Sequence, residues 1–571
     1  MTCQIKSFFT AMAAAFLGLA ILTGCTASHY RKSADKDVYS IIQSAEKEVF
    51  GRTNVFDIST PYSGRNPKEI PSTEILNDRM REGARMLSLE DALNLSVTNS
   101  RTYQAQKERL YLTALTLTGN RHEFRPNWFG RSSVDGDRLS NGERLGSVRS
   151  SAGFSQTLMT GGTIGASIAN DLLRYYTGDP RRSAVTTISV NLLQPVLRGF
   201  GKNHPSVEAL TQAERNVIYA VRDFSYFQNS FAIDVVADYF SLLAQKDVVR
   251  NRYTNYLSRV QATERLVARS QDRESASGVD QARQAELTSK NAYVNAVAQY
   301  ENSLDQFKIA LGLPVTEKIY LDDSLLRELE RTGPIPLELD PSQAFKVAVA
   351  KQLPTLNAID QFEDAKRKVR VAADRLRADI NILADASLQS EGPTDYTKFD
   401  PDDIRAGVGV QLNLPFDRLR ERNSYRATLI TFESQIRNLG LTFDTMKENI
   451  DRGLRTLELR RQTFEIQRNA LELANRRVES ATLLLQAGRA EVRDLVEAQD
   501  AQISAQNAVT AALVGYQDQR LLLLLQLGVI ETESSKFWLK DHLTPELRLN
   551  SGPMQTATAD RIIPPDELFT K

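Results

Sequence analysis

One stretch of the sequence occurs twice: Val279–Gly312, VDQARQAELTSKNAYVNAVAQYENSLDQFKIALG, and Leu495–Gly528, LVEAQDAQISAQNAVTAALVGYQDQRLLLLLQLG. In the first copy, apolar side chains from Tyr293 to Leu311 are spaced alternately four and three residues apart, as in a coiled-coil seam. The second copy keeps this spacing, with Arg520 as the exception. Both copies end in Leu-Gly, a common helix stop. The pair predicts a duplicated coiled-coil helix.

The composition excludes several classes of function. The 571 residues include 71 lysines and arginines and 71 aspartates and glutamates, so a basic footprint for nucleic acid is absent. The four histidines lie far apart, there are two cysteines, and no spacing resembles a zinc or redox site. The sequence also shows no catalytic grouping of nucleophile and base, and we therefore expect no enzyme activity, no metal and no cofactor.

The N-terminus has the pattern of a bacterial secretory signal. Lys6 precedes an apolar run that ends at Leu22–Cys25, LTGC, and this ending resembles a lipobox. We therefore expect a signal peptide at 1–24 and acylation of Cys25, palmitate included. The alternative is a signal peptide followed by a chance cysteine. Thr26 stands where lipoproteins retained in the inner membrane carry aspartate, which favours the outer membrane.

Beyond the N-terminus no apolar run is long enough for a transmembrane helix, since Leu521–Leu525 has only five residues. If the mature chain crosses a membrane, strands must therefore do so. Apolar and polar residues alternate at 185–195, 378–389 and 404–415, as they do in membrane barrel strands. The first half carries about 32 additional residues between its strands. These contain a hairpin candidate at 148–170, which is either an enlarged surface loop or part of a barrel wall.

The two halves share one order: helix, strand, strand, long helix, turn and returning helix. Each long helix, of roughly 60 residues, would be about 90 Å long. The expected segments are a signal peptide at 1–24, a lipid-anchored N-terminal tether at 25–86 with one helix near 37–50, a first repeat at 87–312, a connector at 313–340, a second repeat at 341–528 and a tail at 529–571. The first repeat is expected to hold a helix that starts at a capping box at Ser88, strands at about 126–136 and 185–195, the inserted hairpin, a long helix at 207–270 and a return helix at 275–311. The second is expected to hold a helix at 342–376, strands at about 378–389 and 404–415, a long helix at 424–486 and a return helix at 490–527.

Five short motifs, each weak alone, together resemble one known family. They are Leu87–Leu93 (LSLEDAL), Ala237–Leu243 (ADYFSLL), Gly278–Arg283 (GVDQAR), Ala487–Arg489 (AGR) and Leu495–Gln499 (LVEAQ). In this order, within a duplicated chain, they resemble the TolC-like outer-membrane efflux family. The lipobox points to its lipoprotein branch.

The resemblance implies a mainly α fold with a β membrane part. Long antiparallel coiled-coil helices would form a periplasmic tunnel, and four or more strands per protomer would close a twelve-stranded barrel in a homotrimer. One protomer with four strands cannot close a barrel, and open sheet edges are not tolerated in lipid, so the implied trimer agrees with the physics of the strands.

The implied function is a passive duct in a tripartite efflux or secretion system. Cargo would come from an inner-membrane transporter through a periplasmic adaptor, and the duct would be lipid-anchored in the outer membrane of a Gram-negative-type bacterium. The alternative is a periplasmic adaptor or a structural coiled-coil lipoprotein. Adaptors have one helical hairpin within β domains, whereas this sequence predicts two hairpins and two strand pairs.

The candidate site residues lie near the turns between long and returning helices. The resemblance implies that Asp494 and Glu497, three apart on one helix face, form a cation-selective ring in the pore. The alternative is a solvated face on which Arg493 pairs with Glu497. Some relatives lock the closed tip with an arginine and an aspartate, and the matching residues here are Ala490 and Gly278, so that lock is expected to be absent. Its substitutes would be Arg489, Arg493 or Asp280, and the candidates for adaptor docking are the tip-turn residues Asp272, Arg273, Gly488 and Arg489.

Overall fold

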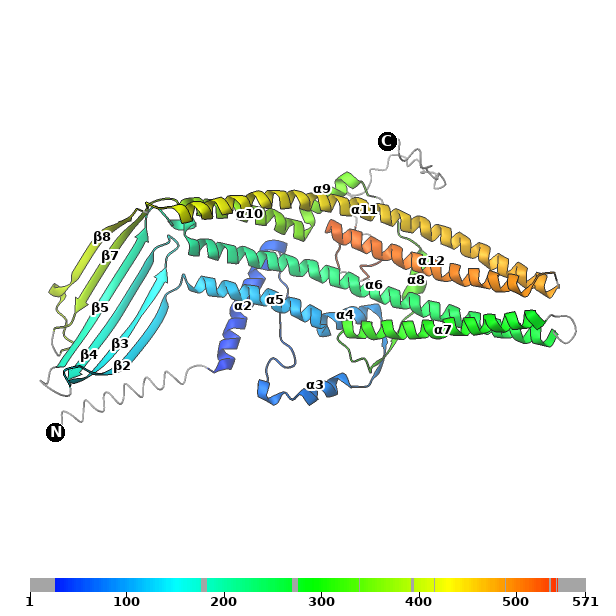
Figure 1. The fold of residues 1–571 in the computed structure, drawn as a ribbon, viewed down its shortest axis with the longest axis horizontal. Coiled ribbons are helices and arrows are strands. Elements are labelled where there is room, and N and C mark those ends of the chain that lie inside the picture. The colour runs from blue at the N-terminus through cyan, green and yellow to red at the C-terminus, as the bar shows by residue number, and fades with distance from the viewer. Residues whose placement is uncertain are drawn as a thin grey trace. The chain divides into compact units, whose positions relative to one another are not determined.

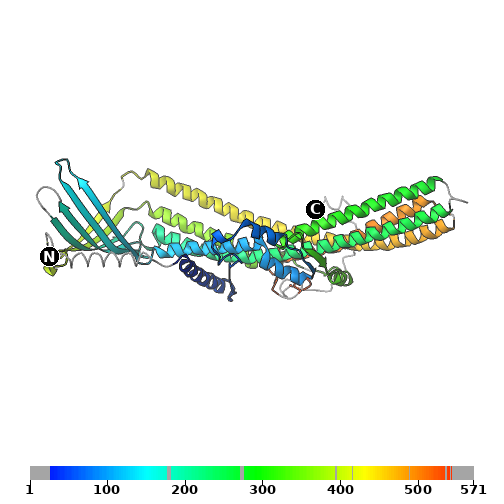
Figure 2. The ribbon, with the colours of Figure 1, turned by 90° about the horizontal axis from the view of Figure 1, so that it is seen from below.

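The structure, a computed structural model, describes residues 26–175, 182–269, 276–337, 339–391, 395–414, 416–487, 489–533, 536–540 and 542. The expected signal peptide, Cys25, Asp272, Arg273 and Gly488 lie outside these residues. The chain divides into two compact units, whose ribbons are seen in Figures 1 and 2. The sheet unit comprises Met1–Ser63, Ala105–Phe224 and Asn357–Leu439, and the coiled-coil unit comprises Gly64–Gln104, Ser225–Leu356 and Gly440–Lys571.

The sheet unit contains one antiparallel sheet with the strand order β2-β3-β4-β5-β7-β8 (Figure 1). The first four strands follow one another in the sequence, whereas β5 and β7 come from different halves of the chain. Their pairing therefore joins the two repeats. The strands are β2 (Asn127–Arg138), β3 (Arg144–Thr157), β4 (Thr163–Tyr175), β5 (Arg182–Pro195), β7 (Asp379–Gln389) and β8 (Arg405–Asn413).

The two faces of this sheet differ in polarity, because alternate residues of a strand point to opposite sides. The strand register places the following side chains on one face, here called the apolar face: Trp128, Val134, Val148, Phe154, Ile164, Ile168, Leu172, Ile188, Val190, Leu192, Ile380, Ile382, Leu388, Val408, Val410 and Leu412. The opposite, polar face carries Arg131, Ser133, Asp135, Arg149, Ser151, Ser155, Ser167, Asp171, Thr187, Ser189, Asn191, Asn381, Asp385, Ser387, Gln411 and Asn413. The exceptions include Phe129, Leu173, Leu193 and Leu383 on the polar face and Ser132, Ser150, Asn170 and Thr186 on the apolar face. Val408 and Val410 are 82% and 71% exposed, so within the chain much of the apolar face is uncovered.

The hairpin expected at 148–170 lies within this sheet. It is formed by β3 and β4, which are longer than expected and stand between β2 and β5. The strand expected at 126–136 therefore pairs with β3 and not with β5. Alternation is weak in β3 because small residues such as Gly146, Ser150 and Gly153 dilute it. The described residues contribute six strands to one sheet, two more than the four on which a twelve-stranded count rests.

Part of the expected tether is folded onto the sheet unit. Helix α2 (Ala27–Phe50) begins ten residues before the helix expected near 37–50. Tyr39 packs edge-on against Tyr111 of helix α5, with ring centroids 6.0 Å apart. The Tyr111 hydroxyl donates to Asp35 at 2.8 Å. These contacts bury aromatic surface that an extended tether would leave in water.

Each half opens with two helices where the sequence predicts one. The capping box forms as expected, with the Asp91 amide donating to Ser88 Oγ at 3.1 Å. The first pair breaks at Ser100 and the second at Gln352. In the second pair Pro354 explains the break, because proline lacks an N–H and clashes with the preceding turn of a helix. The helices are α4 (Leu89–Asn99) and α5 (Arg101–His122), then α9 (Pro341–Lys351) and α10 (Leu353–Asp374).

The coiled-coil unit packs the returning helices against the long ones. Its core takes side chains from both halves, among them Phe240 and Phe307 from the first and Tyr516 and Leu527 from the second. A two-stranded parallel sheet of β1 and β6 borders this core. None of the described helices is long and apolar enough to cross a membrane. The unit holds α3 (Ser72–Arg79), β1 (Ala84–Leu87), α7 (Ala276–Ala310), β6 (Lys318–Leu321), α8 (Ser324–Thr332), α12 (Val492–Leu527) and parts of α6 (Pro205–Arg269) and α11 (Leu419–Gln486).

The repeated Leu-Gly stops have the same surroundings in both halves. Gly312 and Gly528 follow the ends of α7 and α12 with positive φ angles of 74° and 69°. A Cβ on Gly312 would overlap the carbonyl group of Asn99, the last residue of α4. A Cβ on Gly528 would lie 2.8 Å from the carbonyl carbon of Lys351, the last residue of α9. The internal duplication expected from the sequence is thus confirmed at the level of backbone packing.

Arg520, the exception in the apolar seam, holds part of the C-terminal tail. It is fully buried and donates to the carbonyl oxygens of Trp538, at 3.1 Å, and of Lys540. Phe537 and Trp538 are themselves buried in the core of the coiled-coil unit. The described part of the tail has turns and no helix, and it packs against α12 instead of leaving the core.

Candidate functional site

The ends of the long helices and the starts of the returning helices pack together in the coiled-coil unit; this region is called the tip bundle below. Leu266 of α6, Ala282 of α7 and Val492 of α12 form one buried cluster. Ala498 of α12 is buried in a second cluster with Ala481 and Leu495. Ala282 and Ala498 occupy the same position in the two sequence copies, so the small residues that the duplication kept are packing residues.

The predicted pore residues lie at the start of α12, and each has a local partner. Asp494 accepts a hydrogen bond from the backbone N–H of Glu491 at 3.2 Å and so completes a capping box at the helix N-terminus. Glu497 is exposed and lies 2.8 Å from Arg477 of α11. Arg493 pairs with Glu491 at 3.7 Å, so the expected alternative pair between Arg493 and Glu497 is not the one formed. Asp494 is half-buried and Glu497 remains accessible to solvent.

The structure describes only one of the tip-turn candidates, Arg489. Its backbone N–H donates to the carbonyl oxygen of Leu484 at 2.8 Å and closes the end of α11. Gly278 lies in the first turn of α7, and Ala490 stands directly before the cap of α12. The absence of that lock stays a prediction from the sequence.

A buried arginine that the sequence did not single out ties three helices of the tip bundle together. Arg259 of α6 is only 4% exposed. It donates to Asn255 on its own helix at 3.1 Å, to the carbonyl oxygens of Ala285 on α7 at 3.4 Å and Val496 on α12 at 3.5 Å, and it pairs with Asp500 on α12 at 2.6 Å. Burial lowers the pKa of Arg259, and the Asp500 carboxylate partly offsets that effect.

The second half has no counterpart of this tie among its described residues. Arg476 stands ten residues before the end of α11, as Arg259 stands before the end of α6. It is exposed and pairs with Glu472 on its own helix at 3.5 Å. Arg259 was hard to find from the sequence, because the buried stripe that holds it is mostly polar. The members of this stripe are Asn255, Arg259, Thr263 and Leu266.

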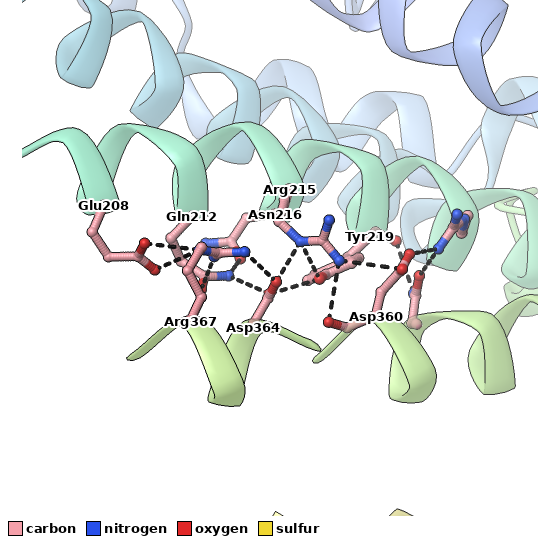
Figure 3. Close-up of polar contacts among 10 residues, drawn as sticks. Glu208, Gln212, Arg215, Asn216, Tyr219, Asp360, Asp364 and Arg367 are labelled. Atoms are coloured by element: carbon pink, nitrogen blue, oxygen red, sulfur yellow. Dashed lines mark hydrogen bonds and ion pairs between the residues drawn. The ribbon is translucent and has the colours of Figure 1, made fainter. Parts of the chain in front are cut away.

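A polar network joins α6 to α10 in the sheet unit (Figure 3). At its centre Asp364 accepts a hydrogen bond from Tyr219 at 2.6 Å and forms ion pairs with Arg215 and with Arg367 at 2.9 Å. Arg367 also binds Glu208 at 2.8 Å. Burial raises the pKa of Asp364, but these donors outweigh burial and hold it below its usual range. The network therefore ties the long helix of the first repeat, α6, to α10 of the second.

A second buried carboxyl, Asp518 of α12, is poorly compensated. One of its oxygens is buried without a hydrogen-bond partner. Burial, with the nearby charge of Asp238 on α6, raises the pKa of Asp518 to about 7. Over the described ranges no group of three or more histidine, cysteine, aspartate or glutamate side chains is placed to hold a metal ion.

We expect the stability of the coiled-coil unit to fall as the pH rises from about 4 to about 7. The folded state favours protonated Asp518, since its folded pKa of about 7 lies above the usual 3.8. This contribution of Asp518 to the free energy of unfolding is complete at pH values below its pKa in the unfolded state. It is lost as the pH rises through its pKa in the folded state. A difference of about three pKa units corresponds to about 4 kcal/mol. Asp518→Asn should flatten the dependence of the melting temperature on pH, and Asp280→Asn, an exposed control on α7, should not. Equal pH profiles for Asp518→Asn and the unaltered chain would contradict this assignment.

The sequence matches no protein-family model and no curated protein. Its fold, however, is similar to solved structures of bacterial outer-membrane proteins. The CmeC outer membrane channel of Campylobacter jejuni is 13% identical, with a TM-score of 0.58 over 77% of this chain and 85% of that chain. The outer membrane protein VceC of Vibrio cholerae is 14% identical, with a TM-score of 0.57 over 77% and 96%. The open state of the MtrE outer membrane channel of Neisseria gonorrhoeae is 11% identical, with a TM-score of 0.58 over 77% and 88%.

These similarities cover most of both chains in each comparison. At 11–14% identity they establish a shared architecture. The chain has the fold of the TolC-like outer-membrane channel proteins.

Proposed function

We propose that this protein is the outer-membrane channel of a tripartite efflux or secretion system. It acts as a passive trimeric duct that passes substrates from an inner-membrane pump and a periplasmic adaptor to the exterior. No chemical step is required of it, because the pump supplies the energy. The single observation that carries this proposal is an antiparallel sheet with one apolar and one polar face, joined to a duplicated coiled coil in the fold of known outer-membrane channels.

The exposed apolar face supports a membrane location for the sheet. Side chains such as Trp128, Val408 and Val410 are 71–82% exposed within the chain. Apolar surface in contact with water costs free energy, and burial of these side chains in lipid would remove that cost. The polar face would then line a water-filled lumen. Acylated Cys25 adds a second anchor, and α2, which starts two residues later, leads directly onto the sheet unit.

The two edges of the sheet support closure by several copies of the chain, and three is the number that the resemblance to the TolC-like channels implies. Among the residues that the structure describes, strands β2 and β8 each have a neighbour on one side only. Unpaired backbone groups cannot be left in lipid, so copies of the chain must close the sheet on itself. Cyclic symmetry supplies this closure with one repeated interface. The tip turns with Asp272, Arg273, Gly488 and Arg489 are then the proposed docking points of the adaptor.

The alternative function, an adaptor or structural lipoprotein, would be held in the membrane by its lipid alone. Replacing the signal by a non-lipoprotein signal, together with Cys25→Ser, removes that lipid. The resulting protein should still need detergent for extraction and should run as a heat-modifiable trimer, because the sheet itself lies in the membrane. Labelled palmitate should enter only the unaltered protein. Release of the lipid-free variant into the soluble periplasmic fraction would reject the channel and favour the alternative.

We expect the double variant Asp494→Asn/Glu497→Gln to lose about half or more of its cation preference. Three protomers bring six carboxylates to one axis, and a ring of carboxylates favours cations in a narrow pore. The measurement is the reversal potential in planar bilayers under a potassium chloride gradient. Glu472→Gln, an exposed acid on α11, serves as the control and should leave the reversal potential unchanged. Unchanged selectivity in the double variant would remove both residues from the pore.

A further inference from the structure

The number of strands in the sheet differs from the number expected for this fold. We propose that three copies close an eighteen-stranded barrel, in which β2 of one protomer pairs with β8 of the next, and that this barrel is too wide to limit the size of the cargo. The inference rests on the proposed trimeric channel, and it adds the seam between protomers and the width of the outer opening.

The two edge strands are suited to pair with each other. An even number of antiparallel strands leaves β2 and β8 running in opposite directions, so the closing contact continues the antiparallel pattern. β2 has 12 residues and β8 has nine, close to the 9–11 residues of a membrane-spanning strand. Neither strand carries a proline or a long run of charge that would block an edge.

The polarity of the faces is continuous across the proposed seam. Trp128 and Val134 of β2 lie on the same face as Val408 and Val410 of β8. On the opposite face, Ser133 of β2 has polar counterparts such as Gln411 and Asn413 of β8. Pairing β2 with β8 therefore extends an apolar outer surface and a polar inner surface around the whole barrel, as a membrane barrel requires.

The β3–β4 hairpin is a fixed part of the wall. It pairs with its neighbours on both sides over all but one or two terminal residues of each strand. On the polar face, Arg149 of β3 lies 3.6 Å from Asp171 of β4, and Ser167 of β4 bonds Ser189 of β5 at 2.8 Å. These contacts hold β4 between two partners, so it is not an outer edge.

The turn of this hairpin is anchored where β5 leads into α6. Gly161 has a φ of +87°, and a Cβ there would overlap the Gly199 carbonyl and lie 2.9 Å from the His204 ring. The Gly201 amide donates to the Thr160 carbonyl at 2.8 Å, and the Thr160 hydroxyl donates to Gln194 at 2.7 Å. Only a glycine permits this close approach, which shows that the added strands and the base of the long helix fit each other.

A wider barrel changes which part of the duct limits passage. Barrel diameter grows roughly linearly with strand number, so eighteen strands give about 1.5 times the diameter of twelve, and barrels of about 16–18 strands enclose an aqueous channel. The polar face then lines a hydrated opening. The size limit on the cargo would then fall on a part of the duct that is narrower than the barrel.

Disulfide cross-linking in the full-length protein in outer membranes tests the seam. Gly409→Cys or Gln411→Cys in β8 is combined with Arg131→Cys, Ser133→Cys or Asp135→Cys in β2, all on the polar face. At least one pair should give covalent dimers and trimers after oxidation. Pairs of the same β8 positions with Ser167→Cys or Ala169→Cys in β4 should give none. If β2 and β3 lay outside the barrel, β4 would be the edge, and the β4 pairs would cross-link in place of the β2 pairs.

The width of the opening is tested in planar bilayers with polyethylene glycols of graded size added on the barrel side. A variant that lacks 144–181 joins β2 to β5 through the existing loop 139–143, and Arg182 takes the register position of Arg144. The largest polymer entering the unaltered barrel should have about 1.5 times the radius of the largest entering this variant. Three results would overturn the inference. They are cross-links from β8 to β4, the lack of any cross-link from β8 to β2 in a protein that forms trimeric channels, and the same largest entering polymer for the unaltered protein and the deletion variant. Failure to form trimers or channels at all would instead reject the proposed function.

Discussion

Replacing Gly312 with alanine should destabilise the coiled-coil unit by about 3 kcal/mol or more, enough to remove most folded protein from the outer membrane. The residue has a φ of +74°, where a side chain costs about 1–2 kcal/mol. The added Cβ would also overlap the backbone carbonyl of Asn99, which no change of rotamer relieves. Because Gly528 makes the equivalent contact with Lys351, Gly528→Ala should have the same effect. Melting temperature and yield of folded protein are the measurements.

Gly440→Ala provides the matched control for these variants. Gly440 lies inside α11 with an ordinary helical backbone, and a Cβ added there would meet nothing within 4 Å. Alanine there should stabilise the helix by about 0.5–1 kcal/mol, because glycine is a poor helix former. If Gly312→Ala and Gly440→Ala shifted the melting temperature in the same direction, the proposed packing of the repeated helix stops would be wrong.

Replacing Arg259 with methionine should loosen the tip bundle and raise the conductance of the channel. The variant keeps much of the side-chain volume but loses the hydrogen bonds to α7 and α12 and the ion pair with Asp500. Hydrogen bonds that involve a charged group are worth about 1.5–3 kcal/mol each, so α12 would be held less firmly at the site of the predicted constriction. The measurements are single-channel conductance and sensitivity of cells to a large glycopeptide antibiotic that the outer membrane normally excludes.

Arg476→Met is the control for this prediction, because Arg476 has the same place in α11 but is exposed. Its effect should be small, as is usual for a surface ion pair. Asp500→Asn should act in the same direction as Arg259→Met and more weakly, since the carbonyl contacts of Arg259 remain. Equal conductance and equal antibiotic sensitivity in Arg259→Met and Arg476→Met would show that this tie does not hold the tip.

The helical part of the fold was predictable because its signals are long and repeated. A stretch of more than thirty residues that occurs twice, each copy with an apolar seam and a Leu-Gly end, leaves few alternatives to a duplicated coiled coil. The breaks at Ser100 and Gln352 were missed, although Pro354 marked the second one. The first has no proline, and it becomes understandable only when Gly312 is seen to pack against it.

The sheet was predictable only in part. β5, β7 and β8 alternate clearly between apolar and polar residues, whereas β3 contains many serines and glycines that blur the period. Pairing between strands is a long-range property, so the sequence could not decide whether the hairpin joined the sheet. The additional strands became visible only through the register of β3 and β4 with β2 and β5.

The candidate site was the least predictable part. Asp494 and Glu497 were found from a family resemblance, and the cap and the Arg477 pair around them depend on the neighbouring helix. Arg259 and Asp518 are charged residues on helices rich in charge, and only their burial distinguishes them. Periodicity of apolar residues cannot reveal a buried polar position.

The most direct test of the channel itself is the conductance of the purified full-length protein in planar lipid bilayers. Discrete, long-lived current steps from single trimers are expected, with a preference for cations that depends on Asp494 and Glu497. The contrary result is a protein that stays bound to the bilayer by its lipid anchor but gives no current steps, either unaltered or as the Arg259→Met variant. That result would contradict the proposal that this chain forms a duct.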